Sequence, residues 1–122
     1  ARAVQFFAPG IPQVYYVGLL AGKNDLKLLE ETKVGRNINR HYYTKEEIDA
    51  EVKRPVVAEL LRMMEFRNAH PAFDGTFELE TCDDDKLVIV RKKGNEWAKL
   101  SADFKAKKFE ITYTEDGEVR AF

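Results

Sequence analysis

The chain has 122 residues, and 20 lysines and arginines against 21 aspartates and glutamates leave a formal net charge of -1. A chain of this length holds one modest core, or one small domain with part of a larger one, and its balanced charge predicts neither nucleic acid nor an anionic membrane as a partner. No run approaches the roughly 20 apolar residues that cross a bilayer. The single cysteine, Cys82, excludes an internal disulfide and fits a reducing, cytoplasmic location.

Residues 1–7 look like the last turns of a helix, which Pro9 and Gly10 end. Residues 11–17 follow as an apolar run without alternation, rich in β-branched and aromatic side chains, which is typical of a parallel strand buried on both faces. Such a strand needs neighbours, and none precedes it. We therefore expect the chain to begin within a fold, at the closing helix and strand of a βα repeat.

A long polar excursion, residues 18–43, leaves the carboxyl end of this strand, where parallel α/β barrels place their active-site loops. Thr44 and Glu47 then form a capping box that predicts the start of a helix. A second helix is predicted from Pro55, with an apolar stripe at three- and four-residue steps, and it ends before Pro71.

From residue 74 the apolar period changes from near four to two, which predicts strands. Turn-type residues separate five candidate strands, so the simplest topology is an antiparallel meander. The predicted fold class is α/β: residues 1–73 form the C-terminal end of a (β/α)8 TIM barrel, with its eighth strand, long loop and final helices, and residues 74–122 form a small five-stranded antiparallel β domain.

Residues 35–43 gather two guanidinium groups, two amides, an imidazole and two phenols in one loop. Such planar donors and aromatic faces suit a carbohydrate. An equally weighted interpretation is that Arg36 and Arg40 pair with acids and only pin the loop. His41 and His70 have no ligand-like spacing, and the carboxylates lie in caps, loops and turns, so no metal site, cofactor or catalytic residue is predicted.

Two groups of motifs resemble a known family. Pro-Gly-Ile-Pro-Gln-Val-Tyr-Tyr-Val-Gly at 9–18 resembles the eighth barrel strand of the alpha-amylase superfamily. Gly-Lys-Asn-Asp at 22–25, Gly-Arg-Asn-Ile-Asn-Arg-His-Tyr-Tyr at 35–43, Arg-Pro-Val-Val at 54–57 and Phe-Arg-Asn at 66–68 resemble its sucrose phosphorylase branch, in glycoside hydrolase family 13. The resemblance covers residues 1 to about 75.

The resemblance implies a retaining glucosyl transfer, in which an aspartate attacks sucrose, a glutamic acid protonates the departing fructose, and phosphate then takes the glucosyl group as α-glucose 1-phosphate. Those carboxylates lie on earlier strands, so this chain alone is expected to be an inactive fragment. The residue that carries over is Arg36, expected to hold the 4-hydroxyl side of the glucosyl unit. Asn37 stands where many relatives have aspartate.

The alternatives are a phosphorylase of the same branch acting on sucrose 6-phosphate or glucosylglycerate, or a non-enzymatic module that binds a carbohydrate or protein. A complete small glycosidase is disfavoured, because no nucleophile and acid are found on paired parallel strands. The isolated apolar strand is an aggregation hazard, so the chain alone is expected to be poorly soluble or partly unfolded. Sucrose and phosphate are the expected partners, and the oligomeric state stays open.

Overall fold

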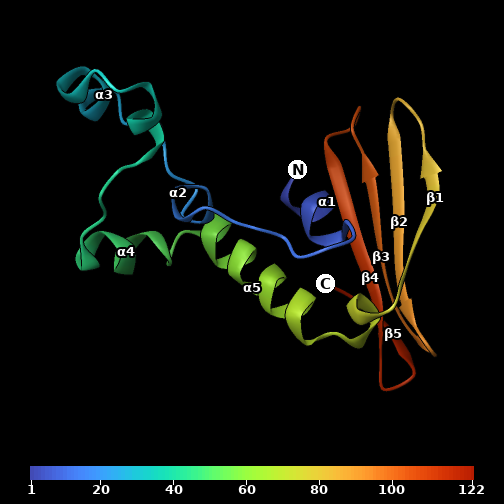
Figure 1. Ribbon diagram of the computed structural model, residues 1–122. Helices are drawn as coiled ribbons and strands as arrows, with labels where there is room; N and C mark the ends of the chain where they lie inside the picture. The colour runs from blue at the N-terminus through green and yellow to red at the C-terminus, as the bar shows by residue number, and fades with distance from the viewer. The chain divides into compact units, whose positions relative to one another are not determined.

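The computed structural model describes all of residues 1–122, which form two compact units. The first unit combines Ala1–Pro12 with Met63–Phe122, and the second is Gln13–Arg62. Helix α5, Pro55–Ala69, contributes its first half to the second unit and its last turns to the first. Figure 1 shows the elements of both units along the chain.

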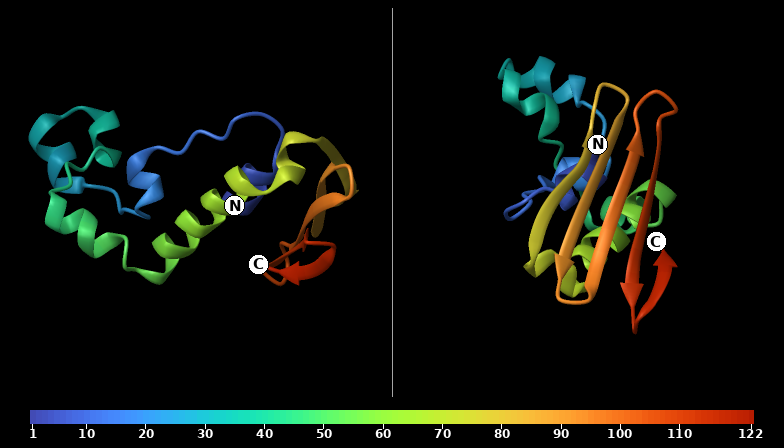
Figure 2. Two further views of the ribbon diagram at one scale, coloured as in Figure 1. Left: turned by 90° about the horizontal axis from the view of Figure 1, so that it is seen from below. Right: turned by 90° about the vertical axis from the view of Figure 1, so that its right-hand side faces the viewer.

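The first unit is built on a five-stranded sheet in the order β1-β2-β3-β4-β5, with each pair antiparallel, as the right-hand view of Figure 2 shows. The strands are β1 (Thr76–Cys82), β2 (Lys86–Lys93), β3 (Glu96–Asp103), β4 (Lys108–Glu115) and β5 (Glu118–Ala121). The predicted meander is confirmed. Asp116 and Gly117 both have positive φ, 54° and 80°, the backbone that a two-residue hairpin turn requires.

The core of this unit lies on one face of the sheet. Ile89, Leu100 and Ile111 stand opposite one another on the three central strands and are almost completely buried. Helix α1 (Arg2–Phe7) contacts β2 and β3. Its Phe7 has no exposed surface, so the N-terminal helix is an integral part of this core.

An aromatic cluster joins the end of α5 to the sheet. The ring of Phe66 lies 5.6 Å from Phe73, 4.8 Å from Tyr113 and 5.3 Å from Phe122. Phe73 belongs to the short 3-10 helix η2, Pro71–Asp74, which contacts β2 and β3. Because such pairs add to the burial of apolar area, the cluster fixes the chain where α5 gives way to the sheet.

His70 links the same region by hydrogen bonds. Its Nε2 lies 2.7 Å from the carbonyl oxygen of Thr114, while its Nδ1 accepts from the amide of Ala72 at 3.3 Å. The second bond leaves Nε2 as the ring's donor. Both ring nitrogens of His70 are therefore engaged by the backbone, which gives His70 a structural role.

We expect Gly75→Ala to destabilise the first unit. A Cβ at Gly75 would overlap the backbone carbonyl of Lys92 on β2, which cannot rotate away. Crowding of this kind lowers the free energy of unfolding by about 1–3 kcal/mol. The matched control is Gly35→Ala, where a Cβ meets no atom within 4 Å. Thermal denaturation of the two variants should separate them, and equal melting temperatures would contradict this account of the contact.

The second unit is made of short helices with little core of its own. Its elements are α2 (Tyr16–Leu19), α3 (Leu26–Thr32), the 3-10 helix η1 (Gly35–Asn39), α4 (Lys45–Glu51) and the start of α5. No residue of α3, η1 or α4 is buried. The predicted capping box is confirmed: Thr44 Oγ1 accepts from the Glu47 amide, and the Glu47 carboxylate accepts from the Thr44 amide.

The predicted strand at residues 11–17 is wrong for this structure. The run has no regular secondary structure from Ile11 to Tyr15, α2 begins at Tyr16, and Ile11 is 97% exposed. A strand needs a neighbour for its amides and carbonyls, and this chain supplies no parallel partner. The structure contains no part of a barrel sheet, so the barrel and the division at residues 73 and 74 stay predictions.

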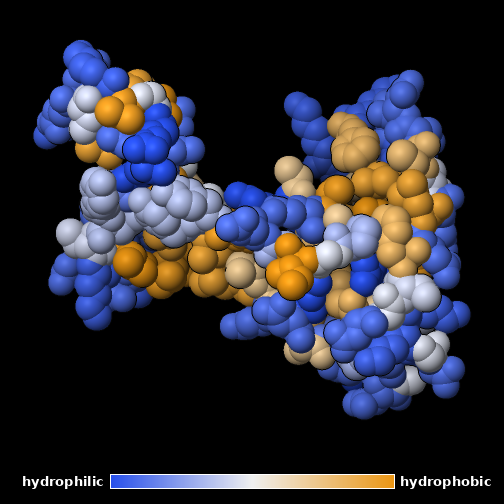
Figure 3. Space-filling view, in the orientation of Figure 1, coloured by the Kyte–Doolittle hydropathy of each residue, from blue (hydrophilic) through white to orange (hydrophobic).

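Large apolar side chains remain on the surface, and Figure 3 shows apolar areas over the sheet and along α5. Those at least half exposed include Ile11, Leu26, Tyr42, Val56, Phe104, Phe109 and Val119. None of the helices combines the length and the apolar character that a membrane span requires.

Candidate functional site

The loop singled out by its composition presents Arg36 on η1. The Arg36 side chain is exposed, and neither Arg36 nor Arg40 forms an ion pair. The interpretation in which both arginines pair with acids to pin the loop is therefore not what this structure shows. A free guanidinium on a defined turn can donate several parallel hydrogen bonds to hydroxyl or carboxylate oxygens of a ligand.

Hydrogen bonds from α3 hold this turn in place. The Asp25 amide donates to the carbonyl of Ile38 at 2.6 Å, and the Asn37 side-chain amide donates to Thr32 Oγ1 at 3.1 Å. Asp25 is also the N-cap of α3, because its carboxylate accepts from the Leu28 amide at 2.9 Å. η1 is thus tied to α3 and its N-cap through the Ile38 carbonyl and the Asn37 side chain.

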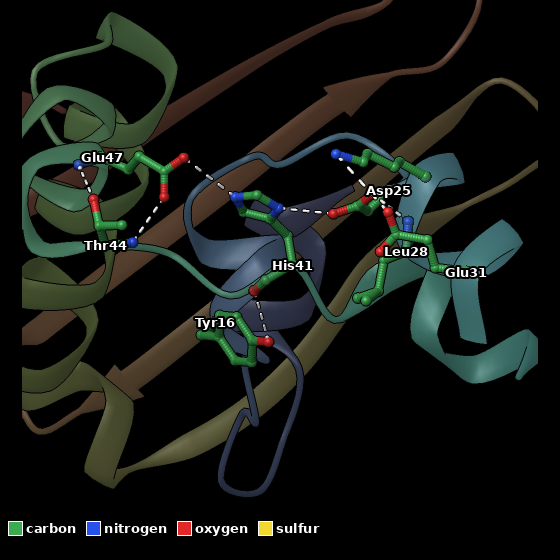
Figure 4. A network of polar contacts seen from close by, with 8 residues as sticks. Tyr16, Asp25, Leu28, Glu31, His41, Thr44 and Glu47 are labelled. Atoms are coloured by element: carbon green, nitrogen blue, oxygen red, sulfur yellow. Dashed lines mark hydrogen bonds and ion pairs between the residues drawn. The ribbon is translucent and has the colours of Figure 1, made fainter.

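His41 lies at the centre of a polar network that Figure 4 shows from close by. Its Nδ1 is 2.8 Å from Asp25 Oδ2, and its Nε2 is 3.4 Å from Glu47 Oε1. The Tyr16 hydroxyl donates to its carbonyl oxygen at 3.0 Å, and the Tyr43 ring stands edge-on at 4.6 Å. The imidazole therefore joins the N-terminal caps of α3 and α4.

The same contacts shift the pKa values of all three groups. Hydrogen bonds from the Leu28 amide and then from His41 lower the pKa of Asp25. The Thr44 amide, and after it His41, lowers the pKa of Glu47. Asp25 first, and then Glu47, raises the pKa of His41. Each contact favours the charged form of its group, so the network is arranged for an imidazolium between two carboxylates.

An open hollow of about 840 Å³ adjoins this network. The side chains that line it are of both signs, with Lys23 and Lys27 as cations and Glu51 as an anion. Arg54, also in the lining, donates hydrogen bonds to the Glu51 carboxylate and to the carbonyl of Leu20. No group of histidine, cysteine and carboxylate side chains is placed to hold a metal ion. The arrangement can bind and orient a polar ligand.

Sequence reasoning placed Arg36 in a loop but missed that His41 joins Asp25 to Glu47. Two signals were present. Asp25 directly precedes a leucine-bearing stretch, a typical N-cap position, and Glu47 is the third residue of the capping box. Neither signal shows that the two caps meet one histidine, because that contact joins residues 16 positions apart.

Comparison with known proteins defines the class. No family model matches the chain. It is 50% identical over 122 residues to a glucosylglycerol phosphorylase of Marinobacter adhaerens, covering 98% of the chain and 25% of that protein. It is 56% identical over 116 residues to a sucrose phosphorylase of Streptococcus mutans, covering 92% of the chain and 24% of that protein. The chain is thus homologous, over nearly all its length, to glycoside phosphorylases.

A solved structure agrees with these relatives. The crystal structure of sucrose 6F-phosphate phosphorylase from Thermoanaerobacter thermosaccharolyticum matches with a TM-score of 0.94 and 48% identity, covering 99% of this chain and 25% of that one. Over nearly all its length the chain is therefore similar to sucrose phosphorylases and their relatives. It spans about a quarter of their length.

Proposed function

We propose that this chain forms the C-terminal part of a retaining phosphorylase, which moves the glucosyl unit of sucrose to inorganic phosphate and yields α-glucose 1-phosphate and fructose. The observation that carries the proposal is the 56% identity to a sucrose phosphorylase over 92% of the chain. Retention implies two successive displacements, with one carboxylate as nucleophile and a second as acid and base. We place both carboxylates in the part of the enzyme beyond these 122 residues.

In this proposal Arg36 binds the donor. Its guanidinium is exposed, has no acidic partner within the chain and sits on a turn held by Asp25 and Thr32. A guanidinium on a turn held in this way is placed in advance of binding, which lowers the cost of orienting a sugar against it. We place the 4-hydroxyl side of the glucosyl unit against it, with an aspartate from the rest of the enzyme as its partner.

The exposed apolar surface supports a longer enzyme. The second unit has Val17, Leu20 and Val57 as its buried apolar residues, whereas Leu26 is 60% exposed and Ile11, just before this unit, is 97% exposed. Surfaces of this kind mark contacts with other protein. We infer that other parts of the phosphorylase cover them, and that residues 11–17 then gain the parallel neighbours of a barrel strand.

Proteins similar to this chain are named for several different donors. A sucrose 6(F)-phosphate phosphorylase of Thermoanaerobacterium thermosaccharolyticum is 50% identical to this chain, like the glucosylglycerol phosphorylase. A glucosylglycerate phosphorylase of Escherichia coli is 29% identical. The conserved quarter therefore fits a shared glucosyl site, and sucrose 6-phosphate is the second candidate donor.

Phosphate-dependent cleavage by the full-length enzyme tests the proposal. The purified enzyme should release fructose and α-glucose 1-phosphate from sucrose, and the anomeric configuration read by proton NMR should be retained. Sucrose 6-phosphate, glucosylglycerol and glucosylglycerate serve as competing donors. The 122-residue chain alone should release nothing. Cleavage of none of these donors would sink the proposal, and a better rate with another donor would replace sucrose.

A further inference from the structure

The structure gives His41 a position that the sequence alone does not explain. It is half-buried between the N-terminal caps of two helices, and each ring nitrogen faces a carboxylate. We propose that His41 is a positioning residue, which bridges Asp25 and Glu47 as an imidazolium and so holds the turn that presents Arg36. The inference deepens the proposed function and rests on it for the role of Arg36.

The geometry favours N–H groups on both ring nitrogens, because Nδ1 is hydrogen-bonded to Asp25 at 2.8 Å and Nε2 lies within ion-pair distance of Glu47 at 3.4 Å. A neutral imidazole has one donor and one acceptor, so one nitrogen would turn its lone pair toward a carboxylate. Asp25 and Glu47 are both held in their charged forms by backbone amides, those of Leu28 and Thr44. A protonated ring satisfies both carboxylates at once and is stabilised by both.

The bridge reaches Arg36 through the backbone. Asp25 binds His41 with its side chain and the Ile38 carbonyl with its amide, so one residue holds the chain on both sides of Arg40. Ile38 belongs to η1, the same 3-10 turn as Arg36. Loss of the bridge removes one of these two ties and lets the turn move relative to α3. Displacements near 1 Å in a positioning group lower rates by up to about 100-fold.

The groups around His41 set the sign of its pH dependence. Asp25 faces it from α3 and Glu47 from α4, and the Tyr16 hydroxyl binds its carbonyl. Lys27 acts on Asp25, and Arg40 acts on Tyr16. The pKa of His41 is raised, so the bridge is complete below the ring's ordinary pKa and is lost as pH rises through the folded value.

A direct titration tests the bridge. The full-length enzyme is labelled with nitrogen-15 histidine, and the His41 signal is assigned by its absence from His41→Gln. We expect a pKa above 6.5, the ordinary value. Asp25→Asn and Glu47→Gln should each lower it, although each keeps a cap acceptor for its helix. Lys45→Ala, which removes only an exposed pair with Asp49 on α4, is the matched control and should leave it unchanged.

Kinetics test the link to Arg36. At saturating phosphate, His41→Gln should weaken donor binding and slow glucosylation together, as Arg36→Ala does, and lower kcat/KM for the donor by about 10-fold or more, since it loosens the binding turn. In an Arg36→Ala background the same change should have almost no further effect, because the group it positions is gone. The KM of the wild-type enzyme for the donor should rise with pH through the measured pKa of His41. In His41→Gln, the only remaining pH dependence of KM should come from the ionisation of phosphate.

The outcomes separate the two proposals. A His41 pKa at or below 6.5, or additive effects of His41→Gln and Arg36→Ala, would overturn the positioning role even in an active phosphorylase. An enzyme that cleaves no donor would overturn the proposed function and the donor-site role with it, while the titration would still decide whether the bridge exists. A raised pKa with non-additive kinetics supports the inference.

Discussion

Arg36→Ala is expected to lower kcat/KM for the donor in the full-length enzyme by about 10- to 100-fold, the loss of one or two hydrogen bonds from a charged group. The guanidinium is exposed and unpaired in this structure, so its removal breaks no contact within the chain. The loss should appear as weaker donor binding and slower glucosylation together, measured by single-turnover kinetics at varied sucrose.

Two further variants serve as a conservative change and a control. Arg36→Lys keeps the charge but loses the planar fork, and it should recover only part of the activity. Lys45→Ala removes an exposed cation of α4 and should behave as wild type. If Arg36→Ala had the same kinetics as the wild type, the donor-site role would be ruled out. If Lys45→Ala lost as much activity as Arg36→Ala, the loss would come from removing any exposed positive charge and not from Arg36 in particular.

Phe7→Ala is expected to have the largest effect on stability, about 3–5 kcal/mol for a fully buried phenylalanine. Phe7 has no exposed surface and meets the edge of Phe73 with 5.0 Å between ring centroids. Its helix contacts β2 and β3, so the cavity would open beneath the centre of the sheet. Hydrogen exchange of the β2 and β3 amides in the full-length enzyme should become markedly faster.

Phe104→Ala is the matched control for this loss. The same residue type is 50% exposed there, just after β3 ends at Asp103, so its truncation leaves no cavity. Substitutions at such positions change stability by about 0.5 kcal/mol or less. If the two variants exchanged alike, α1 would not be part of the core as this structure places it.

The sheet could be predicted almost completely from the sequence, because its information is local. Turn residues such as Asp116 and Gly117 adopt the backbone that their types favour, and on β3 every second residue is buried, as a period of two predicts. The helix start at Thr44 followed from the capping box for the same reason. Local chemistry and tertiary packing agree at these positions.

The prediction failed at residues 11–17, where a strand depends on partners outside the run. Its apolar side chains indicate burial on both faces, yet Ile11 is 97% exposed and Tyr16 begins a helix. Hydrogen bonds of a parallel strand come from neighbours distant in sequence. Without neighbouring strands these residues cannot form the hydrogen bonds of a sheet, and their composition does not show whether such neighbours are present.

The sequence by itself determined the resemblance to sucrose phosphorylases, the five strands and the loop that carries Arg36, because each depends on motifs of consecutive residues. Tertiary structure decided that α1 completes the core of the sheet and that His41 meets Asp25 and Glu47. These contacts join residues far apart along the chain. Their geometry depends on how the backbone folds between them, which no local pattern of residue types encodes.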